Sequence, residues 1–122
     1  MRKKNFTITK TLVDRTFERI NEYGLCRGSF GHSNGECCTI GHLCFAAGVD
    51  PNSWASHRHL LGEIVAMQLK INGVNENDKS PISIANTTIA FFDSNYANIQ
   101  LVKSKIKKLI GQKIELGIGQ KV

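Results

Sequence analysis

The sequence predicts a single, mostly helical α+β domain with about four helices, a short hairpin and a possible terminal strand. Three observations support this fold class. The chain has 122 residues, of which 41% are hydrophobic, which is enough for one core. Apolar residues recur at helical spacing along several segments. Near the C-terminal end, apolar and polar residues alternate instead, which is typical of a strand.

The N-terminal part divides into an arm and a helix. We expect residues 1–6 to form a basic flexible arm and residues 7–122 to form the globular domain. The first helix is predicted from about Thr9 to Tyr23, with Thr11 and Asp14 as a capping pair, and Gly24 ends it. Its apolar stripe consists of Leu12, Val13, Thr16, Phe17, Ile20 and Tyr23.

The segment from Gly24 to Gly48 holds all four cysteines and two of the four histidines. Asn34-Gly35 indicates a tight turn and a short hairpin, because both residues tolerate positive φ. A helix is predicted from about Glu36 to Ala47, with Gly48 in the left-handed position that follows it. Gly41 is unfavourable inside this helix, and indicates either close approach of another backbone or a ligand, or drift without structural cause.

The same segment carries a resemblance to a known family. The matching residues are Gly24-Leu25-Cys26-Arg27-Gly28, then Gly35, Cys37-Cys38, Gly41 and Leu43, and then Ala46-Ala47-Gly48. They resemble a small uncharacterised domain family of actinobacteria and their phages, in which a helix is followed by Gly-Trp-x-x-Gly and Cys-x-x-Gly-Ala-Leu. This chain has Leu25 in place of the tryptophan and His42 in place of the alanine. The family has no established activity, so the resemblance implies an architecture and a phage-type origin only.

The second half of the chain is expected to be mainly helical. Asp50-Pro51 predicts a helix start that runs to about Ser56, with helix continuing or restarting through Lys70. Residues 72–81 are polar and are predicted to form a mobile loop. Residues 82–92 are rich in β-branched and aromatic side chains, which favours a short strand or an irregular segment. A last helix is predicted from Ser94 or Asn95 to about Ile110, and Ile114, Leu116 and Ile118 form the terminal strand pattern.

Basic residues gather at both ends of the chain, whose net charge is +6. This distribution favours binding of a polyanion or an acidic protein, although basic termini also serve only to keep small proteins dispersed. The candidate binding residues are Arg2, Lys3, Lys4, Arg58, Lys103, Lys105, Lys107 and Lys108.

Two kinds of chemistry are conceivable around the cysteines. A thiol in the first turn of a helix has its thiolate stabilised by the helix dipole, so Cys37 or Cys38 is a candidate nucleophile. The candidate catalytic residues are Cys37, Cys38 and His42, with His32, His57 or His59 as alternative bases and Asp93 or Asn95 as the orienting group. Alternatively, Cys26, His32, Cys38 and His42 form a candidate tetrahedral zinc site. The third interpretation is that the cysteines are core residues.

Several functional classes lack their signatures in this sequence. It contains no P-loop, no G-x-G-x-x-G after a strand, no H-E-x-x-H and no G-x-S-x-G. It has no apolar run of membrane-spanning length and no secretory signal, so we expect a cytoplasmic protein that does not act in membranes.

The leading hypothesis is therefore a small, basic, non-enzymatic accessory protein of a phage or mobile element. It would require no cofactor and would bind a host macromolecule, such as a protein or nucleoprotein complex of a defence system that it inhibits. The alternatives are a cysteine-centred enzyme or zinc-binding domain built on Gly24–Gly48, and a nucleic-acid-binding protein.

Overall fold

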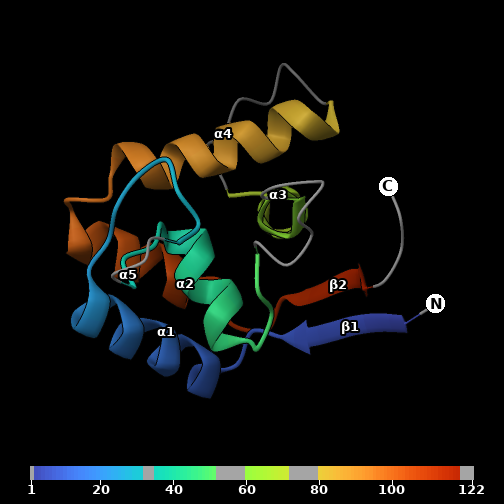
Figure 1. Cartoon of the computed structure of the whole chain (residues 1–122), viewed down its shortest axis with the longest axis horizontal. Coiled ribbons are helices and arrows are strands. Elements are labelled where there is room, and N and C mark those ends of the chain that lie inside the picture. The colour runs from blue at the N-terminus through green and yellow to red at the C-terminus, as the bar shows by residue number, and fades with distance from the viewer. Residues whose placement is uncertain (1, 32–34, 52–59, 72–79, 119–122) are drawn as a thin grey trace.

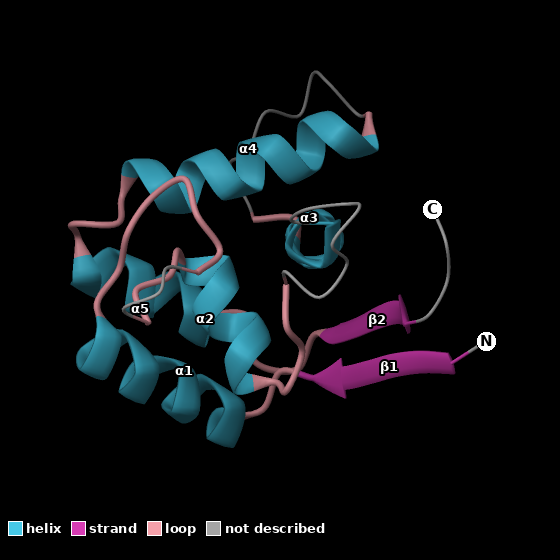
Figure 2. Ribbon diagram, in the orientation of Figure 1, coloured by secondary structure: helices cyan, strands magenta, loops and turns pink. Residues whose placement is uncertain are grey.

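Helices dominate the computed structural model, which describes residues 2–31, 35–51, 60–71 and 80–118. Figure 1 shows α2 and α3 between α1 and α4, with a two-stranded sheet at one end. Figure 2 shows the same arrangement by secondary structure. The elements are β1 (Arg2–Thr7), α1 (Lys10–Tyr23), α2 (Thr39–Ala46), α3 (Leu60–Leu69), α4 (Pro81–Ser94), α5 (Ile99–Lys107) and β2 (Lys113–Ile118). The predicted fold class, a mostly helical α+β domain, is confirmed.

Helix α1 buries Leu12, Val13, Thr16 and Ile20 of the predicted apolar stripe, whereas Tyr23 is 39% exposed. The helix also uses a different cap. Thr9 is the N-cap, and its hydroxyl accepts a hydrogen bond from the Leu12 N–H at 3.1 Å. The predicted capping pair was wrong, because Asp14 forms an exposed ion pair with Lys10 at 2.9 Å instead. Gly24 ends the helix with φ of 85°.

The basic N-terminal segment is a strand and not the flexible arm that was expected. Strand β1 pairs antiparallel with β2, in a register that places Phe6 opposite Ile114 and Lys4 opposite Leu116. Ile114 and Leu116 are buried, so the inner face of the sheet contributes to the core. The alternating pattern correctly predicted β2, whereas β1 depends on this long-range partner.

The segment around Gly35 does not form the predicted hairpin within the described residues. Leu25 and Cys37 instead form an isolated parallel bridge, in which the Cys26 N–H donates to the Cys37 carbonyl at 3.1 Å. Gly35 has φ of 89°, as the turn signal predicted, and Asn34 lies outside the described residues. The loop between α1 and α2 therefore folds back beside the start of α2.

Helix α2 is shorter than predicted and ends as expected. It begins after Cys38 rather than at Glu36. At its end, the Gly48 N–H donates to the Phe45 carbonyl and the Val49 N–H donates to the Cys44 carbonyl. With φ of 78° at Gly48, this pattern is a Schellman motif.

Helix α4 replaces the strand or irregular segment predicted for residues 82–92. Ser80 caps it by accepting from the Ser83 N–H at 3.2 Å, and Pro81 occupies the first turn. The Thr87 and Thr88 hydroxyls donate to the carbonyls of Ser83 and Ile84, which accommodates β-branched residues in a helix. Packing against α3 thus outweighs the local strand propensity.

Helix α5 starts later than predicted, because Asn98 is its N-cap and accepts from the Leu101 N–H at 3.2 Å. Most of the helix predicted from Pro51 to Ser56, and most of the loop predicted at residues 72–81, lie outside the described residues. No helix in the described segments is long and apolar enough to cross a membrane.

Candidate functional site

Cys38 has a capping role at the start of α2. As the N-cap, its sulfur accepts a hydrogen bond from the Gly41 N–H at 3.4 Å. Burial raises the pKa of the Cys38 thiol to about 12, and it outweighs the stabilisation that the hydrogen bond from Gly41 gives the thiolate. The sequence correctly placed this residue at the helix start, but the thiolate expected from the helix dipole is disfavoured at neutral pH.

The other three thiols are also buried, and none of the four is in a disulfide. Cys37 donates to the Gly35 carbonyl at 3.4 Å, and burial raises its pKa despite a nearby Arg19 that acts in the opposite direction. Burial raises the pKa of Cys26 to about 11 and also raises that of Cys44. These environments are typical of structural cysteines rather than of activated nucleophiles.

His42 connects the first two helices from inside the core. Its side chain is 0% exposed, and its Nε2 lies 2.7 Å from the Gly24 carbonyl oxygen. Because a carbonyl only accepts, Nε2 carries the proton, which leaves Nδ1 buried without a partner. Burial lowers the pKa of His42, so the ring is neutral at pH 7. His42 therefore holds the end of α1 against α2.

The predicted zinc set is only partly described. Cys26, Cys38 and His42 lie in the segment around α2, whereas His32 lies outside the described residues. Among the residues with described positions, no three Cys, His, Asp or Glu side chains converge as a metal-binding group. The alternative bases His57 and His59 also lie outside the described segments, as does Arg58 of the predicted binding set.

Gly41 is the residue against which the α1–α2 loop is seated. A Cβ built on Gly41 would lie 2.3 Å from the Phe30 carbonyl oxygen, and one on Gly62 would lie 2.4 Å from the Phe30 ring. Phe30 thus touches α2 with its backbone and α3 with its side chain. The expectation that another backbone comes close to Gly41 is confirmed.

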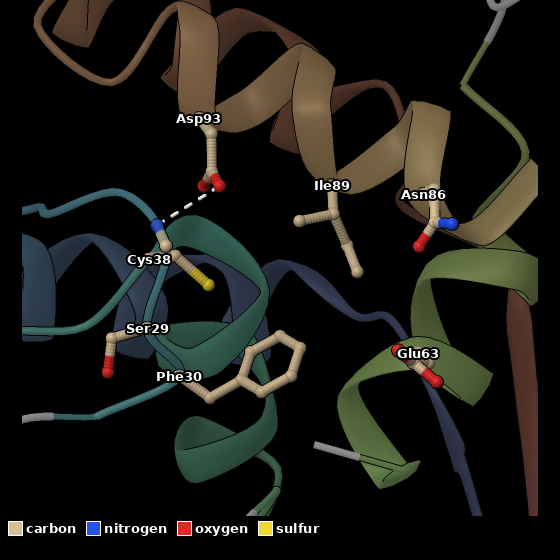
Figure 3. A pocket seen from close by; sticks show the side chains of 8 residues that line it. Ser29, Phe30, Cys38, Glu63, Asn86, Ile89 and Asp93 are labelled. Carbon is tan, nitrogen blue, oxygen red and sulfur yellow. Dashed lines mark hydrogen bonds between the residues drawn. The ribbon is translucent and has the colours of Figure 1, made fainter. Parts of the chain in front are cut away.

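A pocket of about 200 Å³ opens beside this loop, between α3 and α4. Figure 3 shows Phe30 and Ile89 as its apolar walls, with Asp93 near Cys38 at one end and Glu63 near Asn86 at the other. Its described lining residues include two carboxylates, Asp93 and Glu63, and no lysine or arginine. The pocket therefore suits a small ligand that carries a hydrogen-bond donor or a positive charge.

Asp93 contacts the backbone of the α1–α2 loop, and the histidines that it was predicted to orient, His32, His57 or His59, lie outside the described residues. One carboxylate oxygen, Oδ2, accepts from the Gly28 N–H at 3.0 Å, and Oδ1 is buried without a hydrogen-bond partner. Burial raises the pKa of Asp93, although the Gly28 N–H and nearby Arg27 act in the opposite direction. Asn95, the alternative orienting residue, donates to the Phe91 carbonyl at the end of α4.

The predicted lysine cluster covers the solvent side of α5. We call Lys103, Lys105, Lys107 and the C-cap Lys108 the lysine face. Lys107 and Lys108 are exposed, whereas Lys103 and Lys105 are partly buried and flank the buried side of the helix. Two of them extend over aromatic rings, with Lys103 Nζ 5.3 Å from the Phe17 ring centroid and Lys105 Nζ 5.6 Å from that of Phe91. Within the described segments, none of the four forms a salt bridge.

A hollow of about 120 Å³ adjoins the lysine face where α3 and α5 end. Lys70, Lys105 and Lys108 line it together with apolar Leu109, and Ile110 next in the chain is 46% exposed. Lys70 adopts a left-handed backbone with φ of 46°, which is uncommon for a residue with a side chain. The sequence did not single out Lys70 or Ile110, because no local pattern shows that the ends of two helices meet.

Comparison of the chain with protein-family models, curated proteins and solved structures finds no match. The resemblance to the actinobacterial and phage family therefore stays a prediction.

Proposed function

We propose that this chain is a non-enzymatic binding protein whose lysine face docks on an acidic surface of a protein partner. The observation that carries the proposal is the set of four ammonium groups on α5 and its C-cap, which form no salt bridge with the described residues. Surface charges of one sign steer an oppositely charged partner and set its orientation. The buried thiols and neutral His42 support a scaffold role for the segment that otherwise suggested catalysis.

A protein partner fits this surface better than a nucleic acid. Exposed Ile110 lies just beyond the lysine face, and an apolar side chain gains from contact with a protein but not with phosphate. The rings of Phe17 and Phe91 lie beneath Lys103 and Lys105, so they are not open platforms for stacking of single-stranded bases. The expected contact is an acidic patch with an apolar centre.

The test compares two probes by fluorescence anisotropy: a labelled synthetic peptide of Glu and Leu, and a labelled DNA duplex. The variant with Lys105, Lys107 and Lys108 changed to alanine should bind the peptide roughly tenfold or more weakly. Ile110→Ser should also weaken peptide binding without changing DNA binding. A matched control is Lys10→Ala, which removes a lysine from an existing ion pair on α1.

The proposal fails if the triple alanine variant binds the peptide as the wild type does. It also fails if the duplex binds more tightly than the peptide and Ile110→Ser has no effect on either probe. That second outcome would assign the lysine face to nucleic-acid phosphates, whose binding falls steeply with salt.

A second candidate function is binding of a small cation in the pocket beside Asp93, and the buried, unpartnered Asp93 Oδ1 favours it. The probe is an n-butylammonium salt followed by NMR. Asp93→Asn keeps an acceptor for the Gly28 N–H but removes the charge, so it should abolish binding. Equal binding by wild type and Asp93→Asn would exclude this function.

A further inference from the structure

The two outer edges of the β1·β2 sheet are finished differently. On β2, the Gln68 side chain from α3 acts as a substitute strand: its Nε2 donates to the Glu115 carbonyl, and its Oε1 accepts from the Glu115 N–H at 2.9 Å. The outward N–H and C=O groups of Glu115 are thereby both hydrogen-bonded. This edge is closed to further pairing at its centre.

The outer edge of β1 has no such cover among the described residues. Ile8 donates its N–H to the Gln112 carbonyl at 2.8 Å and accepts from the Gly111 N–H at 2.7 Å, so the even-numbered residues face β2. The backbone groups of Lys3, Asn5 and Thr7 consequently face away from the sheet. Within the part of the chain that is described, no hydrogen bond occupies the outward groups of Asn5 or Thr7.

We propose that the free edge of β1, formed by Lys3, Asn5 and Thr7, binds an extended acidic segment of a protein partner by strand addition. Main-chain hydrogen bonds would supply affinity, and alternate side chains would supply specificity. The inference deepens the proposed function, because it gives the acidic partner a second contact with a defined backbone conformation. It does not depend on the lysine face itself.

Charge selects the occupant of this edge. The strand begins with Arg2, Lys3 and Lys4, so a second copy would add three more positive charges to this edge. Like charges across a strand pair are destabilising, whereas Glu or Asp opposite lysine is favourable. A hollow of about 300 Å³ on the strands, lined by Asn5, Thr7 and Lys113 and also by Glu115, leaves room for the partner's side chains.

Proline at Asn5 is the sharpest probe of the edge. Its N–H points outward, so Asn5→Pro removes a donor to the partner and leaves the hydrogen bonds between β1 and β2 in place. Lys4→Pro is the matched control, because it removes an inward N–H and should disrupt β1 itself. If Asn5→Pro does not fold, Thr7→Pro tests the same edge, because Thr7 is the next residue whose N–H points outward.

The experiment titrates the full chain with a short peptide of alternating Glu and Val, and with the same peptide carrying Lys in place of Glu. We expect the acidic peptide alone to slow hydrogen exchange of the Asn5 and Thr7 amides by roughly tenfold or more. Asn5→Pro should weaken its binding by a similar factor while the Phe6 amide stays protected. Unchanged peptide affinity in folded Asn5→Pro, or equal protection by the Lys peptide, would overturn the inference.

Two outcomes separate this inference from the proposed function. If the acidic peptide still protects the β1 amides in the variant with Lys105, Lys107 and Lys108 changed to alanine, strand addition stands even where docking by the lysine face has failed. If the wild type forms a dimer without peptide and Asn5→Pro abolishes it, the occupant is a second copy, and the acidic partner is wrong.

Discussion

Replacing Gly41 with alanine should destabilise the protein, although alanine is the better helix former. The added Cβ would lie 2.3 Å from the Phe30 carbonyl oxygen, well inside van der Waals contact. The loop cannot retreat freely, because the Phe30 ring packs on Gly62 and the neighbouring Ser29 carbonyl accepts from the Cys38 N–H at 2.9 Å. The conflict therefore has to be resolved by shifting the loop away from α2.

The expected magnitude follows from three contributions. Overpacking costs about 1–3 kcal/mol, and a strained loop hydrogen bond costs about 1 kcal/mol more. Helix propensity returns about 1 kcal/mol when alanine replaces glycine. The free energy of unfolding of Gly41→Ala should therefore fall by about 1–3 kcal/mol, which lowers Tm by roughly 3–6 °C for each kcal/mol.

Urea unfolding followed by circular dichroism measures this difference. Ala90→Gly is the matched control, because Ala90 is exposed on α4 and should report the helix propensity alone, a loss of about 1 kcal/mol. An equal or higher stability of Gly41→Ala would refute the reasoning, since it would mean that the loop does not rest on α2.

Four further predictions concern the buried groups and the sheet edge. His42 is neutral in both the folded and the unfolded state above about pH 6.5, but just below this pH only the unfolded ring gains a proton. The free energy of unfolding should therefore decrease as the pH is lowered, by up to about 1.4 kcal/mol per pH unit, and it should decrease less in His42→Asn. Urea unfolding at about pH 7.5 and at about pH 5 measures this difference. The Cys38 thiol has a pKa of about 12 in the folded state, so above about pH 9 the unfolded state loses this proton first. The free energy of unfolding should therefore decrease with rising pH more steeply in the wild type than in Cys38→Ser, and identical slopes would contradict this. Native thiols should react with Ellman's reagent only on unfolding, and one fast thiol in the native protein would restore the nucleophile hypothesis. Gln68→Ala should free the Glu115 amide for hydrogen exchange and cost about 1–3 kcal/mol in urea unfolding, and unaltered exchange would show that Gln68 does not close the edge.

Local signals predicted the parts of the fold that depend on neighbouring residues. The stripe that includes Leu12 and Ile20 predicted α1, because a helix buries residues three and four apart. Gly48 marked the end of α2, because the Schellman motif needs a left-handed residue at that position. Gly41 pointed correctly to a close contact, although the contacting group, the Phe30 carbonyl, was not predictable from spacing.

Local sequence patterns did not predict the features that depend on partners far away in the chain. Strand β1 was taken for an arm, since Arg2, Lys3 and Lys4 look solvated until the register with β2 is known. The sequence favours a short strand or an irregular segment where α4 forms, since the Thr87 and Thr88 hydroxyls find their carbonyl partners only once the helix exists. The candidate site was predicted in part: the α5 lysines were found, but Lys70 joins them only because two helices end at the same place.

Amide NMR of the full chain during titration with the Glu and Leu peptide tests the central claim most directly, because it locates the contact on the molecule. Docking by the lysine face predicts that the largest shift changes fall between Lys105 and Ile110 and at Lys70. Changes centred instead on Gly28, Cys38 and Asp93, with α5 unaffected, would contradict the claim and move the binding site to the pocket beside α4.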